Sequence, residues 1–192
     1  YLLNNNYMTT VNLKLFAQGA YTGSGEMAAE QEVTVTAHVS NGIVETQTAT
    51  LATDGTCSVE FEAEGIFYLG VRTQNTLQVF TAGTVTLNGT TVNYDFTTAA
   101  EQAYGDNQAE VESGVFALYS GDIDGSGTID ALDYAAWEEK YVQYAEGGDA
   151  DLNSDDLVDL SDFCVYEGNI GKSIVYPESF DIGAPNPHAT PR

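Results

Sequence analysis

The chain has 192 residues, with five Lys and Arg against 29 Asp and Glu and a formal net charge of −24. So acidic a chain argues against a nucleic-acid partner, because phosphates need a basic footprint, and against anionic membrane surfaces. The sequence contains no run of 18 apolar residues, so membrane insertion is not predicted.

The first ten residues, YLLNNNYMTT, place apolar residues around an Asn run ahead of the first predicted strand. We expect residues 1–10 to form an extended arm, in a processed form or fragment of a longer chain because no initiator Met is present. An extended apolar segment can add a strand to a neighbour's sheet edge, and head-to-tail contacts of this kind produce filaments. The arm residues predicted to bind a partner are Tyr1, Leu2, Leu3 and Tyr7.

Residues 11–119 alternate apolar and polar positions with the two-residue period of half-buried strands. The clearest runs are VNLKLF, EVTVTAHV, CSVEFEA and IFYLGV, and VETQTATL, TLQVFTA, GTVTLN and VFALY extend the series. Turn signals such as TDG and LNG separate them. About seven to nine short strands in this span predict a mainly β fold, an immunoglobulin-like β-sandwich in the loose sense. A jelly roll is the alternative.

Two acid-rich loops follow, and their first positions, Asp122 and Asp151, are 29 residues apart. Calcium loops supply oxygen ligands from positions 1, 3 and 5, a backbone carbonyl from 7, a ligand often through water from 9 and a carboxylate from 12. Position 8 holds Ile129 and Val158, which we expect to pack the paired loops against each other. The predicted ligands are Asp122, Asp124, Ser126, Thr128, Asp130 and Asp133 in the first loop, and Asp151, Asn153, Asp155, Leu157, Asp159 and Asp162 in the second.

Two Ca²⁺ sites are therefore predicted, and the charge of this region favours them. Thirteen acids and one base lie between Ser120 and Phe163, which is half of the net charge of the chain. A bound cation offsets that repulsion, so calcium is expected to contribute to folding.

Each loop leads into a helix-like run, ALDYAAWEEKYVQYA and LSDFCVYEGNI, and neither loop has a clear entering helix. A loop followed by a helix, twice, with Asp at position 12, resembles the dockerin type I family over about residues 119–170. The resemblance implies a small α-helical calcium module with an antiparallel helix pair, assigned to residues 120–172, and a cohesin-like scaffold as partner. The sequence departs from the family pattern in the long connection between the repeats, in the further twenty residues after the module and at two sets of positions. Asp156 stands where the family has Gly, and Ala131-Leu132 and Leu160-Ser161 replace the polar pairs with which many dockerins grip a cohesin.

The passage from a Thr-rich sandwich straight into such loops, over about residues 67–165, is also similar to large secreted bacterial surface proteins. That similarity implies an extracellular, non-catalytic setting at the bacterial cell surface. The remaining segment, residues 173–192, contains all four prolines and is predicted to be an extended arm or linker.

The sequence carries no recognisable catalytic motif, and we predict that the chain is not an enzyme. The two histidines, His38 and His188, are expected to be surface imidazoles. The alternating Glu residues of SVEFEAE match an exposed strand face better than a glycosidase acid pair.

Three further residues or motifs have competing interpretations. Trp137 suggests sugar stacking, but its place on the first helix-like run favours packing in a core or domain interface. Cys57 and Cys164 could form a disulfide in a secreted protein, although two buried thiols are favoured. The tripeptide from Asn88 to Thr90 matches an N-glycosylation acceptor, which carries little weight in a bacterial chain.

Two functional hypotheses follow from these features. The favoured one is a calcium-stabilised structural subunit that assembles with copies of itself through its terminal arms. The alternative is a binding module, either a dockerin attached to a cohesin-bearing scaffold or a sandwich that recognises a glycan. The dockerin alternative predicts an exposed helix face around Leu132 and Leu160.

Overall fold

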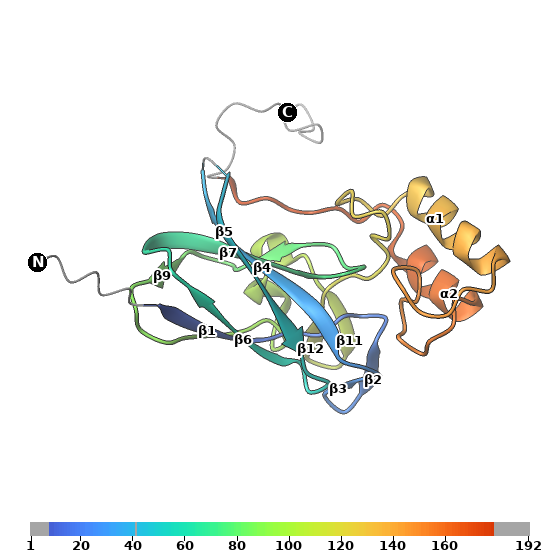
Figure 1. The fold of residues 1–192 in the computed structure, drawn as a ribbon, viewed down its shortest axis with the longest axis horizontal. Coiled ribbons are helices and arrows are strands. Elements are labelled where there is room, and N and C mark those ends of the chain that lie inside the picture. The colour runs from blue at the N-terminus through green and yellow to red at the C-terminus, as the bar shows by residue number, and fades with distance from the viewer. Residues whose placement is uncertain (1–7, 41, 179–192) are drawn as a thin grey trace, which may run out of the picture.

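The computed structural model describes residues 8–40 and 42–178, and it places a β-sandwich beside a pair of helices (Figure 1). The strands are β1 (Thr9–Lys14), β2 (Tyr21–Gly23), β3 (Glu26–Met27), β4 (Gln31–Val39), β5 (Gly42–Leu51), β6 (Thr56–Phe61), β7 (Gly65–Thr73), β8 (Val79–Phe80), β9 (Val85–Leu87), β10 (Val92–Asp95), β11 (Ala109–Glu112) and β12 (Val115–Ala117). The helices are η1 (Ala100–Gln102), η2 (Tyr104–Asp106), α1 (Ala131–Val142) and α2 (Leu160–Asn169).

Two main sheets form the sandwich. One has the order β5-β4-β7-β8, with β9 also pairing with β7, and the other has the order β10-β1-β6. Strand β1 runs antiparallel to β6 but parallel to β10, a direction that residue alternation alone cannot specify. The predicted mainly β, sandwich-like architecture is confirmed.

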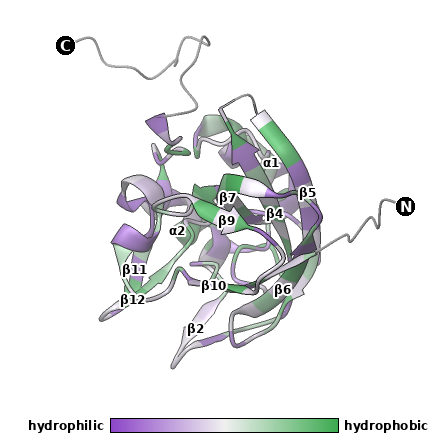
Figure 2. Ribbon diagram, turned by 90° about the vertical axis from the view of Figure 1, so that its left-hand side faces the viewer, coloured by the Kyte–Doolittle hydropathy of each residue, from purple (hydrophilic) through white to green (hydrophobic). Residues whose placement is uncertain are grey.

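The sheets bury their apolar faces against each other, as the two layers in Figure 2 show. Val11 and Leu13 of β1 face the core from one sheet, and Val33, Val35 and Leu69 face it from the other. This alternation is the pattern on which the strand predictions rested, because every second side chain of a strand points to the same face.

The predicted strand TLQVFTA is shorter than expected, because its first residues are used elsewhere. Only Val79 and Phe80 pair with β7, whereas Thr76 forms a bridge with Ser120 and the backbone N–H of Leu77 donates to the carbonyl of Tyr119 at 2.9 Å. These contacts tie the sheet to the segment that leads into the helices.

His38 is not the surface imidazole that the sequence predicts. It is 9% exposed and meets the edge of the Phe80 ring, with ring centroids 5.0 Å apart. Its Nε2 lies 2.6 Å from Oγ1 of Thr36. Of the polar residues of β4, Thr36 and His38 are buried, and His38 is covered because Phe80 packs on it and Tyr176 packs in turn on Phe80.

The helices have a small apolar core of their own. Ile129, Trp137, Leu152 and Tyr166 are among its buried residues, and Leu77 of the sandwich joins them. Trp137 is 4% exposed, which confirms its predicted packing role. None of the helices within residues 8–40 and 42–178 is long and apolar enough to cross a membrane.

The two cysteines are free thiols in distant elements. Cys57 lies half-buried in β6, where burial raises the pKa of its thiol to about 11. Cys164 is exposed on α2, so the expectation of two buried thiols is wrong for this residue, because it lies on an outward-facing part of the helix.

Residues at the inner end of each predicted arm belong to the folded body of the chain. Thr9 is already part of β1. Residues 173–178 run back along the sandwich, where Asn107 donates to the carbonyl of Ser173 at 3.1 Å and the backbone N–H of Glu178 donates to the Tyr104 hydroxyl at 3.1 Å. The chain's own body therefore holds the start of the C-terminal segment.

Candidate metal centre

Loop 1, residues 122–133, connects the sandwich to α1 and gathers acidic side chains. Carboxylate oxygens of Asp122, Asp124 and Asp133 lie within 4.8 Å of one another. Asp122 is 2% exposed and Asp133 is fully buried, whereas Asp124 is exposed. Buried carboxylates in such proximity are costly unless a cation or a proton compensates them.

Asp133, at position 12, organises the loop through its own hydrogen bonds. Its Oδ1 accepts from the backbone N–H groups of Ile123 at 2.7 Å and Asp124 at 3.1 Å, and its Oδ2 accepts from that of Asp130 at 2.8 Å. Asp130 in turn caps α1, accepting from the N–H of Leu132 at 2.8 Å. Positions 9 and 12 thus form a capping box that also starts the helix.

Loop 2, residues 151–162, repeats this arrangement before α2. The Oδ1 of Asp162 accepts from the N–H groups of Leu152 at 2.7 Å and Asn153 at 3.2 Å, and its Oδ2 accepts from that of Asp159 at 2.8 Å. Asp159 caps α2 by accepting from the N–H of Ser161 at 2.6 Å. The two loops therefore have the same internal scaffold at positions 2, 3, 9 and 12.

Position 1 is equivalent in the two loops as well. The carboxylate of Asp122 accepts from the backbone N–H of Gly127 at 3.1 Å, and that of Asp151 accepts from the N–H of Asp156 at 3.0 Å. Each bond runs from position 6 back to position 1 and curls the loop around its first ligand.

The other predicted ligands supply the remaining oxygens. In loop 1 the hydroxyl of Ser126 donates to the carbonyl of Thr128 at 3.1 Å, so the oxygens of positions 5 and 7 are neighbours. In loop 2 the amide of Asn153 donates to Asp155 at 2.9 Å, and Asp155 accepts from the N–H of Leu157 at 3.0 Å. The side chain of Leu157 contains no oxygen, so only its backbone carbonyl can serve as a ligand.

Burial raises the pKa of the innermost carboxyls. The pKa of Asp122 rises to about 6, chiefly because of burial, with the charges of Asp133 and Asp124 adding to the shift. The guanidinium of Arg72 opposes it weakly. Burial likewise raises the pKa of Asp133, and of Asp151 and Asp162 in loop 2. All four groups lie where a positive charge would favour their ionised form.

The donor set fits a hard divalent cation. Every predicted side-chain ligand offers oxygen, as Ca²⁺ prefers, and neither loop contains a thiol or imidazole of the kind that selects zinc. Both loops wind tightly, with positive φ at positions 4 and 6: 70° at Gly125 and 85° at Gly127, and 58° at Ser154 and 69° at Asp156. Asp156, which stands where the family has Gly, therefore adopts the left-handed conformation that glycine favours.

The main-chain partners of position 8 lie outside the two loops. The N–H of Ile129 donates to the carbonyl of Lys172 at 2.9 Å, and the N–H of Val158 donates to that of Ala145 at 3.2 Å. Each loop thus pairs with the segment that follows the helix of the other loop. The side chains of Ile129 and Val158 still share one core.

Sandwich residues reach both loops, and the sequence does not single them out. The side chain of Asn75 donates to the carbonyl of Asp151 at 3.2 Å, and that of Gln31 donates to the hydroxyl of Ser154 at 3.1 Å. Asn169 of α2 donates to Gln18 at 2.6 Å. These partners are far apart in sequence, so no local spacing could have identified them. The predicted partner-binding residues Tyr1, Leu2, Leu3 and Tyr7, and His188, lie outside the described residues.

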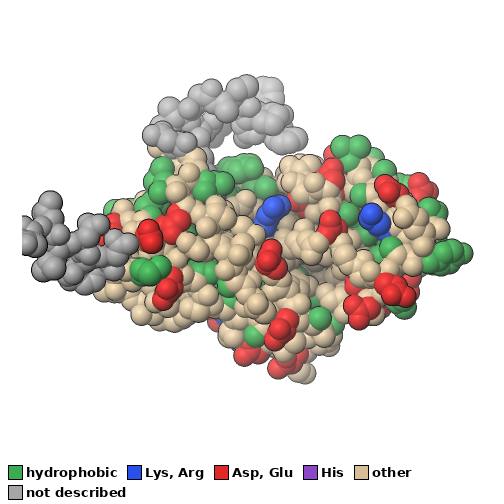
Figure 3. Space-filling model, in the orientation of Figure 1, with side chains coloured by type: hydrophobic (Ala, Val, Ile, Leu, Met, Phe, Trp, Pro, Cys, Tyr) green, Lys and Arg blue, Asp and Glu red, His purple; other side chains and the backbone are tan. Residues whose placement is uncertain are grey.

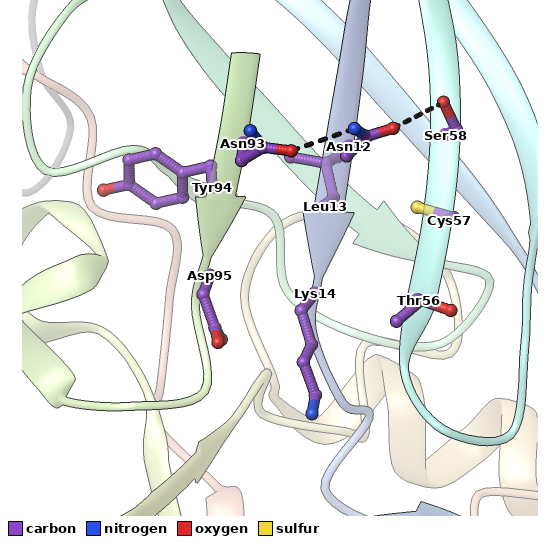
Figure 4. A pocket seen from close by; sticks show the side chains of 9 residues that line it. All are labelled: Asn12, Leu13, Lys14, Thr56, Cys57, Ser58, Asn93, Tyr94 and Asp95. Carbon is purple, nitrogen blue, oxygen red and sulfur yellow. Dashed lines mark hydrogen bonds between the residues drawn. The ribbon is translucent and has the colours of Figure 1, made fainter. Parts of the chain in front are cut away.

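A shallow groove crosses the β10-β1-β6 sheet, with a row of polar side chains along it (Figure 4). Asn12 lies at its centre, donating to Asn93 at 2.9 Å and accepting from Ser58 at 2.9 Å. The hydroxyl of Tyr94 instead donates to the carbonyl of Gln102 at 2.6 Å, on another part of the chain. This ladder satisfies its own polar groups, as expected of a solvated strand face.

The comparisons with known proteins bear on the fold. No protein-family model matches the sequence, and no curated protein does. The structure is similar to a chain in the crystal structure of a type II cohesin–X–dockerin complex from Acetivibrio cellulolyticus, a C-terminal interface mutant. The TM-score is 0.52 at 16% identity, covering 86% of this chain and 97% of that chain. An N-terminal interface mutant of the same complex gives 0.47 at 13% identity, over 86% and 96%.

Proposed function

We propose that the chain is a non-catalytic, extracellular attachment module that binds a scaffold protein through its calcium-loaded helical module. The recognition is of the cohesin–dockerin type, with this chain on the dockerin side. The observation that carries the proposal is a pair of leucines left in solvent, one in the first turn of each helix.

Leu132 and Leu160 each lie in the first turn of their helix, at positions 11 and 10 of their loops. They are 63% and 60% exposed. Val142 and Tyr144, near the end of α1, are 62% and 89% exposed, and apolar side chains are visible at the helical end of the molecule in Figure 3. Exposed apolar groups gathered within one small module favour a partner surface.

The fold comparison supports a cohesin–dockerin setting. Residues 1–119 make up less than two thirds of the chain, so a match over 86% of it extends beyond the sandwich into the helical module. The matched structure is named as a complex of a cohesin with an X–dockerin. A second candidate is the cohesin side of such a pair, which the sandwich-like sheets favour.

Calcium has a structural role in this proposal. Ca²⁺ supplies two positive charges to each acidic loop when it is bound. Asp122, Asp133, Asp151 and Asp162 would hold it from the buried side of the loops, with the more exposed ligands closing each site. Because position 12 also caps the following helix, loading a loop fixes the direction in which its exposed leucine points.

The binding test compares the two helix leucines with an exposed residue of the sandwich. We expect the double variant Leu132→Asp and Leu160→Asp to lose at least tenfold in affinity for a type II cohesin, measured by calorimetry in millimolar calcium, because two apolar contacts are replaced by charges. Ile66→Asp, at a position 64% exposed in β7, is the matched control and should bind normally. Binding to an isolated dockerin but to no cohesin would instead favour the second candidate.

Self-assembly through the terminal arms stays a separate prediction. Light scattering and negative-stain microscopy in calcium and then in excess chelator would test it. Fibres that form only in calcium are the expected result for a filament subunit, and a monodisperse particle of about 20 kDa in both conditions excludes it.

A further inference from the structure

Asn75, in the loop between β7 and β8, stands between the two acidic loops. Its backbone carbonyl accepts from the N–H groups of Gly121 at 2.8 Å and Asp122 at 3.2 Å. Its side-chain Nδ2 donates to the carbonyl of Asp151 at 3.2 Å. One sandwich residue therefore contacts position 1 of both loops.

The amide of Asn75 is enclosed and only half satisfied. The residue is 5% exposed, and its Oδ1 is buried without a hydrogen-bond partner. If the amide were flipped, its oxygen would face the carbonyl oxygen of Asp151, and neither atom can donate a hydrogen bond. The bond from Nδ2 to that carbonyl therefore fixes the orientation of the Asn75 amide. A buried amide oxygen without a donor is costly, and a water held by a cation is one donor that would satisfy it.

We propose that Asn75 is a positioning residue of the metal centre, which seats the first ligand of each loop against the sandwich. It acts on loop 1 through its main chain and on loop 2 through its side chain. This inference rests on the proposal that the loops bind calcium, and it makes the sandwich part of the calcium sites rather than a neighbour of them.

The surroundings of loop 2 show why a single side chain matters there. The sandwich meets this loop at very close range: a Cβ placed on Gly19 would lie 2.2 Å from the carbonyl oxygen of Leu152. Because Leu152 follows Asp151 directly, the sandwich contacts the backbone at positions 1 and 2 through both Gly19 and Asn75. Removing the Asn75 amide deletes one of these contacts and leaves a buried carbonyl without its donor.

Because Asn75 contacts loop 1 through its main chain and loop 2 through its side chain, replacing the side chain should weaken calcium binding in loop 2 only. Asn75→Ala deletes the bond to Asp151 but keeps the carbonyl that accepts from Asp122. Losing one hydrogen bond to a buried carbonyl corresponds to roughly a three- to tenfold loss of affinity. We expect that loss in loop 2, and a change of less than about twofold in loop 1.

The experiment measures calcium affinity by calorimetry in full-length chains with one working loop. Asp122→Ala leaves loop 2, and Asp151→Ala leaves loop 1; Asn75→Ala is added to each. Asn75→Leu, which keeps the volume but not the donor, repeats the test in case the alanine variant unfolds. Asn12→Ala, in the amide ladder of the opposite sheet, is the control and should change neither affinity.

Selective weakening of loop 2 by both Asn75 variants supports the inference. Equal weakening of both loops, or no change in loop 2, overturns it while leaving the calcium proposal intact. A parent chain that takes up no calcium overturns both. Circular dichroism and the thermal midpoint of each apo variant separate loss of affinity from loss of fold.

Discussion

Loops 1 and 2 have the same hydrogen-bond scheme but reach it with different residues. In loop 1, glycines occupy the positive-φ positions 125 and 127, whereas Ser154 and Asp156 occupy them in loop 2. The carboxylate at position 12 accepts the same backbone N–H groups in both loops, and the one at position 1 accepts that of position 6 in both, with a further bond from Asp155 in loop 2. Loop winding is therefore held by buried aspartates strongly enough to keep non-glycine residues in a left-handed conformation.

The loops also differ in where a glycine lies in the main-chain contact between position 6 and its partner segment. In loop 1, Gly127 accepts from the N–H of Ile174 at 2.9 Å, and a Cβ on Gly127 would lie 2.7 Å from the Ile174 side chain. In loop 2, Asp156 accepts from the N–H of Gly147 at 3.1 Å, so the glycine is on the partner segment. A Cβ on Gly147 would lie 3.8 Å from the Asp156 side chain, which is an ordinary contact. Lack of space therefore requires a glycine at this contact in loop 1 but not in loop 2.

Calcium removal is expected to have the largest effect, and it acts on both loops at once. A ligand at 100 times its dissociation constant stabilises the folded state by roughly 2.7 kcal/mol per site. Trp137 is the one Trp of the sequence and lies in the helical core, so its fluorescence reports this module alone. We expect chelator to shift its emission to the red and to lower the thermal midpoint measured there. An unchanged Trp137 signal would mean that the loops do not depend on a cation.

Removing position 12 tests whether the loops are energetically equivalent. Asp133→Ala and Asp162→Ala each leave three backbone N–H groups without an acceptor and remove a helix capping contact. Each change is expected to cost about 2–4 kcal/mol in the free energy of unfolding and to abolish binding in its own loop. Urea unfolding with a calcium titration measures both. A much smaller loss for Asp162→Ala would contradict the equivalence that the shared hydrogen bonds indicate.

Exchange at position 6 sharpens the contrast between the loops. Asp156→Gly removes a left-handed non-glycine residue and keeps the N–H that bonds to Asp151, so it should stabilise loop 2 by about 0.5–1 kcal/mol. The reverse change, Gly127→Asp, should destabilise loop 1 by more than that, because its side chain meets Ile174. Urea unfolding followed at Trp137 gives both values, and a destabilising Asp156→Gly would refute the strain argument.

The sandwich is expected to respond to pH through His38, with the smallest effect of the four. Burial lowers the pKa of this imidazole below its usual value. Protonation therefore favours the unfolded chain, so the stability contributed by the neutral ring is present above about pH 6.5 and is lost as pH falls toward the lower folded pKa. The unfolding free energy of His38→Gln should fall less than that of the parent between pH 7 and pH 5. Identical slopes would show that other groups account for the acid sensitivity.

Much of the fold and of the candidate site could be predicted from short-range patterns. The helices begin at Ala131 and Leu160, directly after position 9 of each loop, because the capping aspartates that start them belong to the twelve-residue motif itself. The strands of the sandwich followed from alternation, since a strand needs only a two-residue period to bury one face. In each case the bonds that form the element join residues close together in the sequence.

Tertiary structure decided which surfaces meet. Three contacts join residues that are tens of positions apart in the sequence. Ile129 pairs with Lys172, His38 is buried against Phe80, and Asn75 contacts both loops. The amino-acid sequence by itself determined two acidic loops, each leading into a helix, after a run of strands, because those features are local. Only the tertiary structure determined that the sandwich contacts the loops. That contact depends on the topology, which brings the β7–β8 loop next to both acidic loops.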